Sequence, residues 1–254
     1  MMHYTITGNG QPIVLVHGFG EDSRIWENQV ASLQQIARLI IPELPGTGRT
    51  NPEPSVSMES MADGIAAILL SEKIDKAIII GHSMGGYITL AFAEKYPDML
   101  TAFGLVHSTA YADTEQKKEA RAKSMEFIRQ HGTAVFLEST TPNLFTAKNR
   151  PFIDKTIHYI ATSNSYILPG TLISFLEAMI QRKDKTLILS QSRVPVLFVV
   201  GKDDQAVPFA NTMQQVHLPQ LSYIHILRQS GHMGMLEETE KCTNAIIQFL
   251  NMVK

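Results

Sequence analysis

The sequence of 254 residues has little of the material that several protein classes require. It contains one cysteine, Cys242, which excludes an internal disulfide and is expected to be a small buried hydrophobe. No apolar run approaches the roughly 18 residues of a membrane span, and no basic and apolar leader opens the chain. The 22 Lys and Arg balance 24 Asp and Glu, so nothing suggests a nucleic-acid or anionic-membrane surface. We therefore expect a soluble cytoplasmic protein, monomeric or homodimeric.

What the sequence does contain is an ordinary globular composition, with 44% hydrophobic and 18% charged residues. Short, continuously apolar runs, typical of strands buried on both faces, alternate with helical patterns over the first 106 residues. The expected strands cover residues 12–16, 37–41, 77–80, 102–106, 194–200 and 223–227. Their strict alternation with helices favours an α/β fold with a mostly parallel, doubly wound sheet and right-handed crossovers.

The alternation stops between about residues 110 and 190, where the sequence indicates no buried strand. We expect this stretch to be an all-helical insertion long enough to cover one end of the sheet. The core domain is then formed by residues 1–109 and 191–254, and residues 110–190 form a cap.

Two helices of the insertion can be placed from the sequence. Asp113 is expected to begin a charged helix, with Gln116 three residues on as in a capping box, that runs to about Gln130. A strong amphipathic stripe at helical spacing follows over residues 172–180. Most of its apolar side chains are expected to pack against the core domain, and a minority to face a pocket.

The most informative motif is Gly81-His82-Ser83-Met84-Gly85, directly after an apolar run. Gly-x-Ser-x-Gly between a strand and a helix is the sequence form of a nucleophile elbow, whose strained turn projects the serine hydroxyl clear of the sheet. The two glycines are needed because a Cβ at either position would collide with the neighbouring strand or helix. The alternative is a plain strand-to-helix turn whose serine caps the helix.

A serine hydroxyl becomes a good nucleophile only when a base takes its proton and a third group orients that base. Asp204 and His232 follow the last two expected strands. Because residues beyond the carboxyl ends of parallel strands converge on one edge, we expect Ser83, Asp204 and His232 to meet there. Their order along the chain is the one that accompanies this elbow. Asp203 adjoins Asp204 and stays an alternative acid.

On these residues the chain resembles the α/β-hydrolase fold family over essentially its whole length. The matching segments are Gly81–Gly85, Gly201–Asp204 with Val207-Pro208, Gly231-His232 with Leu236-Glu237, His17–Gly20 and Pro45–Arg49. The resemblance implies that Ser83 is the nucleophile, His232 the general base and acid, and Asp204 the residue that orients the imidazole. It also implies an oxyanion hole made by the backbone N–H groups of Phe19 and Met84.

The other histidines are given lesser roles. His17 and His82 flank the expected site and are expected to pack and hydrogen-bond there, not to ionise in the mechanism. His107 ends a strand, and the sequence leaves open whether it lines the pocket. The remaining histidines of interest have no spacing typical of metal ligands: His131, His158, His217 and His225. No cofactor or metal is expected.

The resemblance implies a serine hydrolase that cleaves a small hydrophobic ester or lactone through an acyl-enzyme on Ser83. The substrate is a small acyl compound in an apolar pocket under the cap. Carbon–carbon bond hydrolysis, perhydrolysis and acyl transfer are alternatives on the same triad, and a slow-turnover ligand sensor is the alternative outside enzymes. A dinucleotide site is disfavoured because Ser23 replaces the third glycine of Gly-x-Gly-x-x-Gly.

Overall fold

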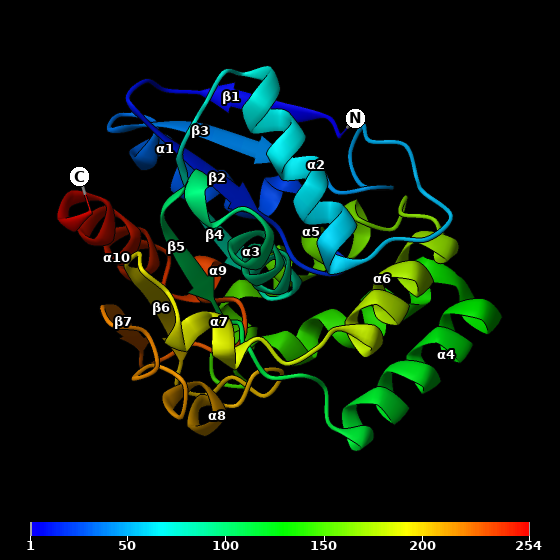
Figure 1. Ribbon diagram of the computed structural model, residues 1–254. Coiled ribbons are helices and arrows are strands. Elements are labelled where there is room, and N and C mark those ends of the chain that lie inside the picture. The colour runs from blue at the N-terminus through cyan, green and yellow to red at the C-terminus, as the bar shows by residue number, and fades with distance from the viewer. Residues whose placement is uncertain (1, 254) are drawn as a thin grey trace.

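The computed structural model describes residues 2–253 as one seven-stranded sheet with helices on both faces (Figure 1). The strands are β1 (Tyr4–Thr7), β2 (Gln11–Val16), β3 (Ala37–Pro42), β4 (Ala77–His82), β5 (Leu100–Val106), β6 (Val196–Gly201) and β7 (Ser222–Leu227). Their order across the sheet is β1-β3-β2-β4-β5-β6-β7, and β1 alone among them runs antiparallel to its neighbour. The expected mostly parallel α/β sheet is confirmed.

The helices divide between the two faces of the sheet and the insertion after β5. They are η1 (Ser23–Trp26), α1 (Glu27–Leu33), α2 (Met58–Ser71), α3 (Met84–Lys95), η2 (Pro97–Met99), α4 (Glu115–Thr140), η3 (Thr141–Leu144), α5 (Arg150–Ser163), α6 (Pro169–Gln181), α7 (Thr186–Ser190), α8 (Phe209–Met213), α9 (Gly234–Glu237) and α10 (Thr239–Met252). Alternate residues of β2 show the two layers. Val14 and Val16 pack with α2 and α3, whereas Ile13 and Leu15 pack with α1 and α10.

Helix α2 forms where its sequence pattern indicated. The Ser57 hydroxyl accepts from the Ser60 N–H and the Ser60 hydroxyl accepts from the Ser57 N–H, which closes a capping box at its start. Met61, Ile65 and Leu69 then follow at helical spacing and are buried against the sheet.

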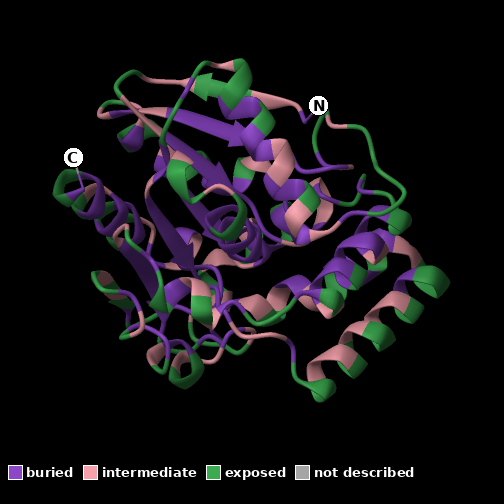
Figure 2. Cartoon of the chain, viewed as in Figure 1, coloured by how far each residue is buried: buried purple, intermediate pink, exposed green. Residues whose placement is uncertain are grey.

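The segment between β5 and β6 contains helices joined by loops and no strand, and in Figure 1 its helices α4, α5 and α6 lie beyond the carboxyl ends of the central strands. Its two ends are joined where the Lys185 N–H donates to the Ala110 carbonyl at 2.8 Å. The side chains of the α6 stripe are buried among α2, α3 and α4, and the outer face of α4 is exposed (Figure 2).

The expected start of α4 at Asp113 is wrong. The helix begins after Thr114, whose hydroxyl accepts from the Lys117 N–H. The Asp113 carboxylate is instead buried between two guanidinium groups, with Arg121 Nε at 2.5 Å and Arg182 Nη2 at 3.0 Å. A carboxylate with two such partners is more strongly bound than one that caps a helix.

Other boundaries also differ from the sequence-based expectation, and β6 begins at Val196 instead of Val194. Helix α4 continues past Gln130 to Thr140, with a kink at Gly132, whose φ of +79° lies outside the helical region. The helix after Pro208 ends at Met213 instead of Val216. Strand β1 was not expected, because it is short, half exposed and placed at the edge of the sheet. Within residues 2–253, no helix is both long and apolar enough to cross a bilayer.

Candidate active site

The turn between β4 and α3 has the geometry of a nucleophile elbow. Ser83 has φ +51° and ψ −115°, a conformation that costs energy for any residue with a Cβ. A Cβ at position 81 would collide with the Gly85 backbone, and a Cβ at position 85 would collide with the Val16 carbonyl of β2. Both glycines are therefore required, and Ser83 does not cap α3 with its side chain.

The three residues predicted to meet do so at the carboxyl edge of the sheet. The Ser83 hydroxyl lies 2.8 Å from Nε2 of His232, and Nδ1 of His232 lies 2.9 Å from Oδ2 of Asp204. His232 and Asp204 are buried, and Ser83 is half buried. An unbroken hydrogen-bond path therefore joins a buried carboxylate to the hydroxyl on the strained turn.

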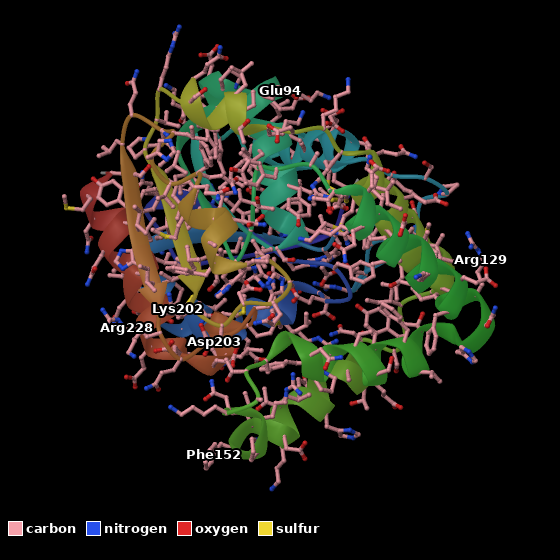
Figure 3. All side chains as sticks on the ribbon, turned by 90° about the horizontal axis from the view of Figure 1, so that it is seen from below. Glu94, Arg129, Phe152, Lys202, Asp203 and Arg228 are labelled. Carbon is pink, nitrogen blue, oxygen red and sulfur yellow. The ribbon has the colours of Figure 1, made fainter. Side chains whose placement is uncertain are left out.

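The structure distinguishes the two neighbouring aspartates. The Asp204 Oδ1 atom accepts the N–H groups of Ala206 and Val207 at 2.9 and 2.8 Å, so its carboxylate is fixed at both oxygens. Asp203 is exposed, and in Figure 3 it lies near Lys202. Only Asp204 is in contact with His232.

The Asp204 carboxyl is held in its ionised form. Burial by itself would raise its pKa, but the positive field of His232 and the hydrogen bonds from His107 and His232 hold the pKa of Asp204 well below its usual range. A carboxylate that stays charged keeps the Nδ1 proton of His232 in place and leaves Nε2 free to accept the Ser83 proton.

The loop after β2 holds the first predicted oxyanion-hole donor. The Gly18 N–H donates to Oε2 of Glu21 at 2.8 Å, whereas the N–H groups of Phe19 and Met84 have no hydrogen-bond partner within residues 2–253. The Phe19 ring packs edge-on against Phe136 of α4, with centroids 6.1 Å apart. The helical segment therefore lies directly against the loop that carries this N–H group.

His82 takes part in a buried ion pair that the sequence did not indicate. Its Nδ1 atom lies 3.0 Å from Oε2 of Glu21, and its Nε2 atom lies 3.1 Å from the carbonyl oxygen of His232. Burial favours a neutral ring, but the Glu21 carboxylate outweighs it and raises the pKa of His82. These contacts agree with the expectation that His82 packs and hydrogen-bonds beside the site, and neither of its ring nitrogens is hydrogen-bonded to Ser83 Oγ.

His17 and His107 are both buried and both hydrogen-bonded. His17 accepts the Leu44 N–H at Nε2, and its Nδ1 donates to the Gly18 carbonyl at 2.9 Å, which orders the loops around the site. His107 does not lie at a surface of the site, because its ring is 1% exposed and its Nδ1 lies 3.2 Å from Asp204 Oδ2. A histidine at the end of an apolar strand was the only sequence signal for this contact.

Potential metal ligands gather at one place in residues 2–253, where atoms of His107, Asp204 and His232 lie within 4.8 Å of one another. Both Nδ1 atoms there face the Asp204 carboxylate, and Nε2 of His107 accepts the Gly234 N–H at 3.2 Å. A metal at Nδ1 of His107 would move the ring proton to Nε2, against that N–H group. The donor set therefore fits a hydrogen-bond network better than a metal ion.

The loop that carries His232 is tied to the helical segment. The His232 N–H donates to the Leu144 carbonyl at 2.8 Å. Oε1 of Glu237 accepts the Gly231 N–H, and its Oε2 accepts the Thr146 N–H. The position of the imidazole therefore depends on contacts from both the sheet and the insertion.

With this geometry in view, comparison with known proteins places the chain among the α/β hydrolases. The profile of the Alpha/beta hydrolase family matches residues 13–245, and the chain belongs to that family.

Three individual relatives are an esterase, an enol-lactonase and a dienoic acid hydrolase. A solved thermophilic esterase from Thermogutta terrifontis is 30% identical, has a TM-score of 0.93, and the match covers 99% of this chain and 93% of that one. The enol-lactonase from Burkholderia xenovorans LB400 has a TM-score of 0.90 at 23% identity, over 98% and 96% of the two chains. The 2-hydroxy-6-oxo-6-(2'-aminophenyl)hexa-2,4-dienoic acid hydrolase of Metapseudomonas resinovorans is 25% identical over 98% of this chain and 87% of its own length.

Proposed function

We propose that this α/β hydrolase is a serine hydrolase that cleaves a small hydrophobic ester or lactone through an acyl-enzyme on Ser83. The observation that carries the proposal is the hydrogen-bond path from Asp204 through His232 to the Ser83 hydroxyl on the strained elbow. The likeness to a solved esterase over 99% of the chain supports the ester as the substrate class.

In the proposed acylation step, Nε2 of His232 takes the Ser83 proton while Oγ attacks the substrate carbonyl. The negative oxygen of the tetrahedral intermediate accepts the N–H groups of Phe19 and Met84, which have no partner within residues 2–253. As the intermediate collapses, the proton on Nε2 passes to the leaving alkoxide. Asp204 stays ionised and stabilises the imidazolium.

Deacylation repeats the step with water in place of Ser83. His232 removes a proton from water, the hydroxide attacks the acyl carbonyl, and the proton returns to Ser83 Oγ as the acid leaves. This sequence uses only side chains and backbone groups of the chain, so no step requires a cofactor or metal.

Hydrolysis of a carbon–carbon bond is the second candidate. It is favoured by the likeness to a dienoic acid hydrolase at 25% identity over 98% of the chain. The same Ser83, His232 and Asp204 would serve, with the proton of Nε2 delivered to a carbon leaving group. Perhydrolysis, acyl transfer and slow signal binding use the same path, and turnover rates on graded esters, lactones, thioesters and diketones separate these cases.

The assignment of the nucleophile is tested with a fluorophosphonate probe. The wild-type protein is expected to be labelled at Ser83, and Ser83→Ala is expected to lose both labelling and turnover of short acyl p-nitrophenyl esters. Ser230→Ala is the matched control, because Ser230 is a buried serine two residues from His232 that makes no contact with its ring. Labelling that survives Ser83→Ala would rule the assignment out.

A further inference from the structure

The carboxylate of Asp204 faces two imidazole rings, and only one of them belongs to the proposed hydrogen-bond path. Oδ2 lies 2.9 Å from Nδ1 of His232 and 3.2 Å from Nδ1 of His107. His107 immediately follows β5, and its backbone N–H donates to the Val199 carbonyl of β6 at 2.9 Å. The second histidine is thus attached to the same pair of strands that positions Asp204.

The hydrogen bonds of His107 fix its protonation. The Gly234 N–H donates to Nε2 at 3.2 Å, so Nε2 carries no proton and Nδ1 of the neutral ring must carry it. Nδ1 therefore donates to Asp204. Complete burial lowers the pKa of His107 to about 4, so the ring stays neutral above about pH 4.

The backbone is arranged to admit this ring. His107 has φ +50°, one of the few positive values outside glycine in residues 2–253. A Cβ at position 234 would lie 2.3 Å from Nε2 of His107, whereas a Cβ at position 201 would first meet the Gly231 carbonyl at 2.1 Å. The glycine at 234 and the strained backbone at 107 thus place one imidazole against Asp204, which ordinary core packing does not require.

We propose that His107 is a positioning residue for the hydrolysis proposed above: its Nδ1–H fixes Oδ2 of Asp204 and withdraws part of the carboxylate's charge from His232. With Oδ1 held by Ala206 and Val207, both oxygens are then oriented before His232 is engaged. A carboxylate that shares its charge with a neutral donor attracts a proton on His232 less strongly.

The other charged groups around this network come from each neighbouring element. The β4 turn supplies His82, whose ring centroid is 5.1 Å from that of His232, and the loop after β2 supplies its partner Glu21. The α9 helix supplies Glu237 through the Gly231 N–H. Lys117 of α4 donates to the Ala206 carbonyl beside Asp204. Of these groups, His82 packs edge-on against His107, with ring centroids 6.1 Å apart, and none of them is hydrogen-bonded to it.

The test compares a substitution of His107 that keeps an N–H donor toward Asp204 with one that removes it. In His107→Asn the amide nitrogen can take the place of Nδ1–H, and asparagine tolerates a positive φ. His107→Ala removes the donor, and His107→Gly does the same without backbone strain if the alanine variant does not fold. His225→Ala is the control, because His225 is a half-buried histidine on β7, outside the site.

Two readouts are measured across pH: the rate of fluorophosphonate labelling of Ser83, and the ring titration of His232 by NMR. We expect His107→Ala to move the midpoint of the His232 titration, and with it the acid limb of the labelling profile, to higher pH. At pH 6 labelling should fall about tenfold, the effect of one hydrogen bond to a charged group. His107→Asn and His225→Ala should stay near the wild type.

An unchanged His232 midpoint in His107→Ala, or an equal shift in His107→Asn and His107→Ala, would overturn the positioning role. The NMR readout does not depend on turnover, so it separates this inference from the proposed function. If Ser83 is not labelled in the wild type but the midpoint moves as expected, the hydrolase proposal fails and the contact stands. If labelling is normal and the midpoint does not move, the hydrolase proposal stands and the positioning role of His107 fails.

Discussion

Two buried pairs of a carboxylate and a histidine lie next to each other, with their histidine ring centroids 5.1 Å apart, and they are built alike. In one, Glu21 accepts the Gly18 N–H and lies 3.0 Å from Nδ1 of His82. In the other, Asp204 accepts two backbone N–H groups and lies 2.9 Å from Nδ1 of His232. The difference is in the second ring nitrogen, because that of His82 meets a carbonyl oxygen and that of His232 meets a hydroxyl.

This difference decides what each ring can do. His82 faces an acceptor at both nitrogens, so its doubly protonated form is stabilised and it has no group with which to exchange a proton. His232 faces an acceptor at one nitrogen and a hydroxyl at the other, so it can take a proton and return it. The same two residue types thus make a structural ion pair in one case and, under the proposed function, an acid–base pair in the other.

The largest effect is expected when the pair of Asp204 and His232 is disrupted. Asp204→Asn is expected to lower kcat/KM for a short acyl ester by about 10⁴-fold, because the asparagine amide favours the wrong His232 tautomer. The protein should stay folded, since an amide can keep part of the Asp204 contacts. Steady-state kinetics with thermal melting of the same samples measures both quantities, and activity near the wild-type level would show that the carboxylate does not orient His232.

Breaking the first pair is expected to affect stability more than chemistry. Glu21→Gln leaves His82 buried without its counter-charge and should cost about 3 kcal/mol of unfolding free energy, measured by urea denaturation. The double variant Glu21→Gln/His82→Gln removes both charges and should recover part of the loss. A fall in activity with no loss of stability would contradict the structural role of the Glu21–His82 pair.

The pH dependence of stability should distinguish His107, the second partner of Asp204, from His82. The pKa of His107 is lowered to about 4 by burial, so between roughly pH 6.5 and 4 the unfolded chain binds a proton that the folded protein does not. Stability is therefore lost as pH falls through this window, by up to about 1.4 kcal/mol per pH unit from this group.

His107→Asn removes that contribution and should flatten the plot of unfolding free energy against pH below pH 6.5. His82→Gln should not flatten it there. The pKa of His82 is raised, with Glu21 overcoming the effect of burial, so its contribution is complete below about pH 6.5 and is lost as pH rises. Urea denaturation of the His107 and His82 variants at several pH values measures how steeply the unfolding free energy depends on pH. Equal slopes below pH 6.5 for wild type and His107→Asn would contradict a lowered pKa for His107.

The smallest effect is expected at Asp203, the sequence neighbour of Asp204. Asp203 is exposed and does not contact His232, so Asp203→Asn should change kcat/KM less than twofold and stability by less than about 0.5 kcal/mol. Figure 3 shows it beside Lys202 and Arg228. A loss comparable with that of Asp204→Asn would leave the acid of the site unassigned.

The parallel sheet and the meeting of Ser83, Asp204 and His232 could be predicted because both follow from local patterns. Apolar runs predict buried strands, and a residue just beyond a strand is placed by the strand itself. The Glu21–His82 pair and the His107–Asp204 contact could not be predicted, since their partners are 61 and 97 residues apart and only tertiary packing brings them together. Asp113 was misassigned for the same reason, because the distant Arg182 decides its role.

The contact that joins Ala110 to Lys185 bears on how such proteins diversify. The chain leaves the sheet and returns to it at one point, so residues 111–184 form a closed loop whose length does not affect the strand register. Recombination could therefore exchange this stretch for a longer or shorter one while Ser83 and Asp204 keep their places. Under the proposed function, an exchange of this stretch, which packs against Phe19, would change substrate preference without moving the groups proposed to break the bond.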